Sequence, residues 1–184
     1  RIISGVTVPS SGTVIIQGRV APLLEPFLGM QPELTGLENI YLNGLTLGMR
    51  RGEIQHKFDT IVDFAGIKDF LGMQLKHYSL GMIMRLGFSV AIHVDADIIL
   101  VDEAWSVGDA EFQAKSFERL QSMRRREEPT LIMVSHELEI IRQQTEETLW
   151  LHQGKVASLG PTGQVIDAYL EAVRSGRIPT GDSP

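Results

Sequence analysis

The chain contains no cysteine in its 184 residues, which excludes a disulfide scaffold, a thiolate metal site and a cysteine nucleophile. No apolar run approaches the ~18–20 residues that a membrane-spanning helix needs, and no signal peptide is recognisable. A G-x-S-x-G hydrolase elbow is also absent. Basic residues number 17 against 23 acidic ones, so the net charge of −6 argues against a protein that coats nucleic acid. These absences predict a cytoplasmic protein without a nucleic-acid partner.

What is present is typical of a soluble globular domain: 43% of the residues are apolar and 22% are charged. The length fits one domain with a sizeable core. Near the start, residues 13–17 are mostly β-branched and apolar, and Gly18 interrupts them. Residues 19–25 are again mostly apolar. This pattern predicts a pair of strands.

The middle of the chain has helical periodicity. Thr35 with Glu38 three residues later forms a capping-box pattern, which predicts a helix from about residue 37. Apolar residues then recur at spacings of three and four over residues 51–65, which predicts a second helix. Residues 82–94 are apolar on nearly all sides, as in a buried helix.

Two short apolar runs follow, at residues 98–101 and 131–134, with a helical pattern between them. Continuous apolar runs are typical of parallel strands covered on both faces, and strand–helix–strand predicts a right-handed βαβ unit. A hairpin over residues 148–159 and a helix over residues 163–174 complete the pattern. The predicted fold class is α/β, with a mostly parallel sheet flanked by helices.

Polar residues follow both apolar runs directly: Asp102 and Glu103 after the first, Ser135 and His136 after the second. Ligands of open parallel sheets bind at the carboxyl ends of the strands. Of two adjacent carboxylates, one can hold Mg²⁺ and the other can activate a water, while a nearby histidine can contact a phosphate. The alternative is structural: the carboxylates end a strand, and His136 is a satisfied polar residue at a helix start.

Ser79, Leu80 and Gly81 stand at the start of the most apolar predicted helix. Helix N-termini present free N–H groups and a positive dipole end, which attract anions. The alternative is a plain serine N-cap before a core helix. The sequence alone leaves both interpretations open.

Taken in order, these segments resemble the nucleotide-binding subunit of ATP-binding cassette (ABC) transporters. Residues 97–103 (DIILVDE) resemble the Walker B strand, residues 78–82 (YSLGM) occupy the place of the LSGGQ signature, and Ser135-His136 match the switch histidine motif. The resemblance implies an inserted helical subdomain at about residues 36–80, the remaining RecA-like core at 81–174 and a tail at 175–184, all within one partial domain.

The resemblance also implies the cofactors, ATP and Mg²⁺, and the residue roles. Asp102 is the Mg²⁺-associated carboxylate, while Glu103 and His136 are the catalytic base and the phosphate-contacting histidine. Nucleotide-binding roles fall to Ser79, Gly81, Met82 and the D-loop residue Asp109, with Arg85 as the basic residue after the signature. A glutamine-loop residue is expected at Glu25 or at Gln31.

A narrower resemblance is visible in residues 32–44 (PELTGLENIYLNG) and 101–113 (VDEAWSVGDAEFQ). It is to the ATPases that export O-antigen, capsule and teichoic acid. It implies a homodimer of ATP-binding subunits, bound to an integral membrane permease on the cytoplasmic face of the bacterial inner membrane, with a lipid-linked polysaccharide as the cargo. The alternatives are a cassette ATPase of another exporter or of a non-transport process, and a non-catalytic remnant.

The chain departs from the family pattern at three places, one of which is the glutamine loop, where Glu25 or Gln31 is the positional match. The P-loop motif G-x-x-x-x-G-K-[ST] is absent, and the chain begins at Arg1 just after its expected position. We therefore expect an N-terminally truncated chain whose 184 residues do not bind ATP by themselves. Leu80 replaces a small residue in the signature, where its side chain either crowds the γ-phosphate or points away.

Overall fold

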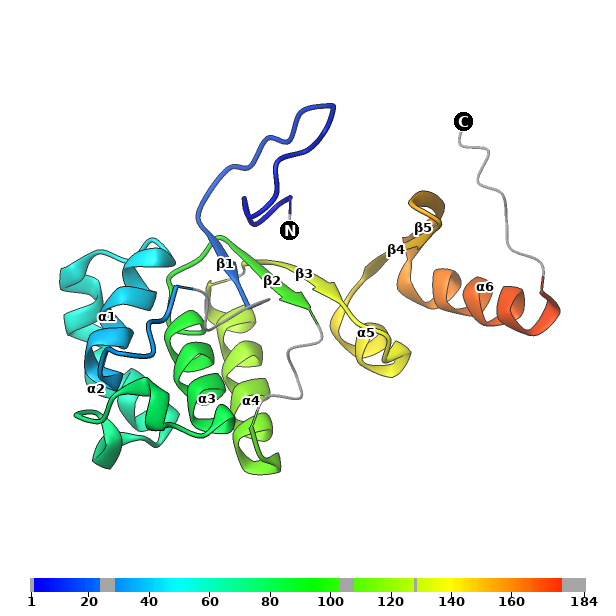
Figure 1. Ribbon diagram of the computed structural model, residues 1–184. Helices are drawn as coiled ribbons and strands as arrows, with labels where there is room; N and C mark the ends of the chain where they lie inside the picture. Colours follow the sequence, from blue (N-terminus) through cyan, green and yellow to red (C-terminus); the bar gives the residue numbers. More distant parts are fainter. Residues whose placement is uncertain (1, 24–28, 103–107, 128, 177–184) are drawn as a thin grey trace. The chain divides into compact units, whose positions relative to one another are not determined.

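The computed structural model describes residues 2–23, 29–102, 108–127 and 129–176, with the side chains of 124–127 excepted. The chain forms two compact units, Arg1–Ile132 and Met133–Pro184, and each is described by itself (Figure 1). Glu25 and Glu103 lie outside the described residues. Within the part that is described, no helix is long and apolar enough to cross a membrane.

Three helices of the first unit pack against one another (Figure 1). They are α1 (Gly36–Thr46), α2 (Arg51–Ala65) and α3 (Leu80–Ala91), with short 3-10 turns at Lys68–Phe70 and Leu75–His77. The predicted bounds of α2 are confirmed. Its apolar stripe is buried, because Ile54 and Ile61 have no exposed surface. The predicted capping box of α1 is also present, since Thr35 and Glu38 bond each other's backbone N–H groups.

A three-stranded sheet has the order β1 (Val20–Pro22), β2 (Ile98–Asp102), β3 (Thr130–Val134). Strands β1 and β2 are parallel, with Val20 opposite Ile98. Helix α4 (Ala110–Glu127) connects β2 to β3, so the predicted strand–helix–strand order is confirmed. The interior of β2 is buried, as its continuous apolar run predicts.

Two strand predictions are wrong in part. Residues 13–17 form no strand, and the side chain of Ile15 is 82% exposed. A β-rich composition forms a ladder only when a neighbouring backbone pairs with it, and none of the described strands lies beside these residues. Strand β3 was expected to be covered on both faces, but it alternates and Val134 is 58% exposed. The alternating burial indicates that one face of β3 is less covered than the other, as in a strand packed on one side.

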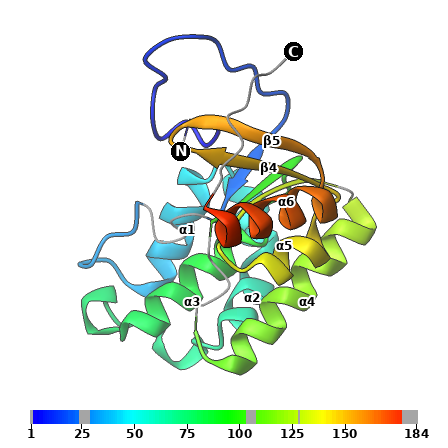
Figure 2. The same cartoon turned by 90° about the vertical axis from the view of Figure 1, so that its right-hand side faces the viewer.

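The second unit contains α5 (Leu138–Gln144), β4 (Glu147–His152), β5 (Lys155–Pro161) and α6 (Thr162–Ser175) (Figure 2). The predicted hairpin and final helix are confirmed. The hairpin turns at Gln153 and Gly154, which both have positive φ, as a tight two-residue hairpin turn requires. Helix α6 packs on the hairpin through an edge-to-face contact of Trp150 with Tyr169, whose ring centroids are 5.3 Å apart.

Candidate functional site

The signature-like segment lies at an exposed helix N-terminus. Ser79 is the N-cap of α3, and its Oγ accepts a hydrogen bond from the backbone N–H of Met82 at 3.2 Å. Ser79, Leu80 and Gly81 are all exposed, and Leu80 shows 75% of its surface. A Cβ added at Gly81 would meet only the Ser79 Oγ, at 3.9 Å, so a ligand can approach the backbone there. The structural cap is therefore present, and its surroundings also fit a phosphate.

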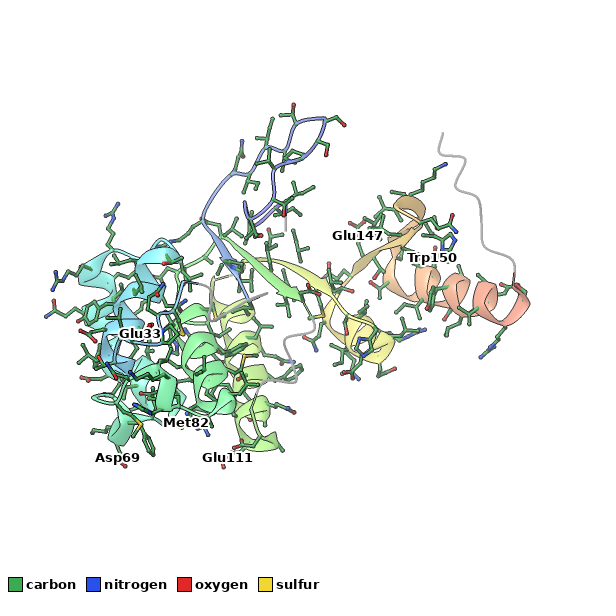
Figure 3. All side chains as sticks on the ribbon, in the orientation of Figure 1. Glu33, Asp69, Met82, Glu111, Glu147 and Trp150 are labelled. Atoms are coloured by element: carbon green, nitrogen blue, oxygen red, sulfur yellow. The ribbon has the colours of Figure 1, made fainter. Side chains whose placement is uncertain are left out.

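Met82 stands in the first turn of α3, where Figure 3 labels it. Its side chain is half-buried, and its backbone N–H is held by Ser79. One turn later the side chain of Arg85 lies 3.6 Å from the carboxylate of Asp109. The structure thus brings together the signature-like helix and the segment predicted as the D-loop.

Asp102 is the last residue of β2. Its side chain is exposed while the three residues before it are buried, so the strand delivers a carboxylate to the surface at its carboxyl end. A carboxylate in this position suits a hard divalent cation, which takes oxygen ligands and retains several waters. The described residues contain no group of three or more histidine or acidic side chains arranged for a metal. Asp102 is a single exposed oxygen ligand of the type that Mg²⁺ binds.

Ser135 and His136 belong to the second unit, whereas Asp102 belongs to the first. Each is therefore described within its own unit. Ser135 Oγ accepts a hydrogen bond from the backbone N–H of Glu137, which is the N-cap of α5. His136 lies exposed between them, directly before the helix. This local geometry matches the predicted strand-end position of His136.

Of the two candidates for the glutamine-loop residue, the structure describes Gln31. Its side chain is exposed, and its backbone is held by a buried asparagine of α1, Asn39. Asn39 Oδ1 accepts from the N–H of Gln31 at 2.7 Å, and its Nδ2 donates to the carbonyl of Gln31 at 3.0 Å. The same amide group also donates to the carbonyls of Leu34 and Thr35.

The sequence analysis did not select Asn39. The available signal was an asparagine on the buried face of α1, one turn before a second asparagine, Asn43. A buried side-chain amide must have hydrogen-bond partners, so such a residue indicates that its amide binds backbone groups of a neighbouring loop.

A surface hollow lies away from these residues. It is lined by Arg19, Gly48, Arg50, Gly52, Glu53 and Asp95. Arg19 precedes β1 and Asp95 precedes β2, so the hollow lies at the amino ends of these strands. Ligand sites of parallel sheets lie at the opposite, carboxyl ends. The hollow is therefore not part of the candidate site.

Curated relatives align with nearly the whole chain. The O-antigen export system ATP-binding protein RfbB of Klebsiella pneumoniae is 37% identical over 172 residues, which is 94% of this chain and 70% of that protein. The teichoic acids export ATP-binding protein TagH of Bacillus anthracis is 38% identical over 95% of this chain, but the match spans only 31% of that protein. A comparison with models of protein families finds no match.

Solved structures support the fold. An ATP-binding subunit of an ABC transporter superposes with a TM-score of 0.66 at 18% identity, covering 89% of this chain and 64% of that one. The dimeric ATP-binding cassette MJ0796 in a post-hydrolysis state gives 0.61 at 21% identity, covering 78% and 63%. The expected α/β class with a parallel sheet is thus confirmed as the cassette fold. By its sequence identity to the Klebsiella relative, the chain belongs to the ATP-binding proteins of ABC transporters, in the subfamily that includes O-antigen and teichoic acid export proteins.

Proposed function

We propose that this chain forms most of an ATP-hydrolysing cassette that powers export of a lipid-linked surface polysaccharide across the bacterial inner membrane. One observation carries the proposal: 94% of the chain aligns at 37% identity with an O-antigen export ATP-binding protein. The chain spans 70% of that relative and smaller shares of others, so the activity of the whole protein belongs to the proposal. We assign residues 36–80 to a helical subdomain and residues 81–174 to the remaining core.

The proposed chemistry takes place between two copies of the cassette. The Ser79 hydroxyl and the backbone N–H of Gly81 bind phosphate oxygens of ATP held by the other copy. Met82 contributes by donating its backbone N–H to the Ser79 Oγ, which fixes that hydroxyl at the helix start. Asp102 holds Mg²⁺, which offsets the charge of the phosphates. The exposed helix N-terminus at Ser79 supports this assignment, because free N–H groups and the helix dipole both favour an anion.

The remaining roles follow the family pattern. Glu103 takes a proton from the attacking water, and His136 donates a hydrogen bond to the transferring phosphoryl group. Asp109 is the D-loop residue, and either Glu25 or Gln31 is the glutamine-loop residue that senses the phosphate. The cassette acts as a homodimer on the cytoplasmic face of the membrane and drives an integral permease.

The test compares the 184-residue chain with a fusion in which the P-loop-bearing segment of the Klebsiella relative precedes residue 1. We expect calorimetry to find no Mg-ATP binding by the chain alone, because no G-x-x-x-x-G-K-[ST] sequence is present to cradle the phosphates. We expect the fusion to bind and hydrolyse ATP. The matched control is the same fusion with its P-loop lysine replaced by alanine.

The cargo is tested in a Klebsiella strain that lacks its own O-antigen export ATP-binding protein. The fusion should restore O-antigen on the cell surface, and the control fusion should not. Tight Mg-ATP binding by the chain alone would contradict the need for the P-loop. A fusion that hydrolyses ATP without restoring any surface polysaccharide would contradict the assigned cargo.

A further inference from the structure

Arg85 joins three helices of the first unit. It stands in α3, one turn after the signature-like segment, and its Nε donates a hydrogen bond to the carbonyl of Ala65 at the end of α2, at 3.0 Å. Its guanidinium lies over the ring of Phe112 in α4, 5.0 Å from the ring centroid, and 3.6 Å from a carboxylate oxygen of Asp109. One side chain therefore contacts the end of α2 and the start of α4 at the same time.

The surroundings fix the position of this guanidinium. Phe112 is 2% exposed and makes edge-to-face contacts with Phe64 and Phe88, so its ring is a rigid platform for a cation. On the other side, Gly66 ends α2 with a φ of 65°. A Cβ on Gly66 would lie 2.6 Å from an Arg85 nitrogen. A glycine there permits both the left-handed helix end and the close approach of Arg85.

Asp109 uses its two carboxylate oxygens differently. Oδ1 accepts a hydrogen bond from the backbone N–H of Phe112 at 2.9 Å, as an aspartate at a helix N-cap does. Oδ2 faces Arg85. The Asp109 side chain is 64% exposed, and an exposed ion pair alone contributes little to stability. The better-buried contacts with Ala65 and Phe112 therefore set the place of Arg85, and Arg85 in turn orients Asp109.

We propose that Arg85 is a positioning residue: it holds Asp109 and the first turn of α4 in a fixed relation to the signature-like helix α3. For its effect on ATP hydrolysis the inference rests on the proposed function, because Asp109 and Ser79 are assigned there to one nucleotide site. The contacts of Arg85 with Ala65, Phe112 and Asp109, which we call the Arg85 junction, require no nucleotide. The ordering of α4 by this junction and its effect on ATP hydrolysis are therefore tested separately.

The junction is tested by hydrogen exchange at the Phe112 amide in the 184-residue protein. We expect Arg85→Gln to speed this exchange about threefold, which is the size of effect that losing one exposed charged partner of the Asp109 cap produces. Asp109→Asn keeps an N-cap side chain but removes the charge. In that background Arg85→Gln should have a clearly smaller effect. Arg85→Lys should restore part of the protection, and 0.5 M NaCl should remove the part that Lys restores.

The matched control is Arg142→Gln, which breaks an ion pair with Asp167 at 2.8 Å in the second unit. It removes the same functional group and should leave the Phe112 amide unchanged. Unchanged Phe112 exchange in Arg85→Gln would overturn the proposal. So would equal effects of Arg85→Gln with and without the Asp109 charge, because Arg85 would then act only by packing.

The catalytic consequence is tested in the ATP-hydrolysing fusion. We expect Arg85→Gln to lower kcat by about tenfold with the KM for ATP unchanged, since Arg85 orients the site without touching ATP. A raised KM with unchanged kcat would overturn the positioning role. If the fusion proves inactive, the proposed function fails, whereas the exchange measurement still decides whether Arg85 orders the start of α4.

Discussion

The buried His93 predicts a specific loss of stability in mild acid. The residue is 5% exposed, and its ring lies edge-on to Phe64 with the ring centroids 5.3 Å apart. Its Nδ1 donates a hydrogen bond to the carbonyl of Ser89 at 2.7 Å. Burial lowers the pKa of His93 from 6.5 to about 4; the nearby cations Arg119, Lys57 and Lys115 act in the same direction, and the Ser89 carbonyl opposes them.

The direction of the pH effect follows from which state binds the proton. Well above pH 6.5 the ring is neutral in both the folded and the unfolded chain, so it contributes nothing. Between pH 6.5 and about 4, His93 is protonated in the unfolded chain but stays neutral in the folded chain. Protonation therefore stabilises the unfolded state, and the free energy of unfolding falls as the pH is lowered. From pH 7.5 to pH 5 this one residue accounts for a loss of about 2 kcal/mol.

The assay is urea unfolding followed by circular dichroism at pH 7.5 and pH 5, for the wild type and for His93→Gln. The substitution removes the titrating ring, so the stability lost between the two pH values should shrink by about 2 kcal/mol. His56→Gln, at an exposed position of α2, is the matched control and should leave the loss unchanged. A His93→Gln protein with the wild-type loss would refute the reasoning, as would an NMR titration of the His93 ring with a midpoint near 6.5.

Three further predictions concern single residues. Leu80→Ser should change the free energy of unfolding by less than about 0.5 kcal/mol, because the side chain is 75% exposed. It should not lower the ATPase rate of the fusion. A large loss of rate would show that Leu80 makes a contact in the working protein. Glu103→Gln in the fusion should reduce hydrolysis at least about 100-fold while calorimetry still detects ATP binding, and hydrolysis near the parental rate would contradict its role as base. Thr35→Ala should destabilise the chain by about 1 kcal/mol in urea unfolding, because the N-cap hydroxyl of α1 is lost, whereas Thr46→Ala, at an exposed helix end, should have a smaller effect.

Much of the fold could be predicted from the sequence because it depends on local patterns. The spacing of apolar residues predicts α2 with its observed bounds, and the capping pattern of Thr35 places the start of α1. The strand predicted at residues 13–17 is wrong, because strand formation depends on a partner that local pattern does not reveal.

The candidate site was predictable where it depends on position along an element. Ser79 stands at its predicted helix start, and Asp102 ends its predicted strand. The contacts of Arg85 were not predictable, because they join residues that only tertiary folding brings together. Asn39 reaches backbone groups within eight residues of itself, but its sequence position does not reveal which of them it binds. Their periodicity indicates which side of a helix they occupy, but not which backbone groups their side chains reach.

The hydrogen bonds that Asn39 makes to the backbone between Gln31 and Thr35 affect how much entropy is lost when a ligand or protein binds this segment. A loop that orders only when a partner binds loses conformational entropy at that moment, which weakens binding. Here a fully buried amide already holds the backbone of Gln31, while the Gln31 side chain remains exposed. The Gln31 backbone is thus pre-organised, and a ligand or protein that contacts it there has little further ordering to bring about.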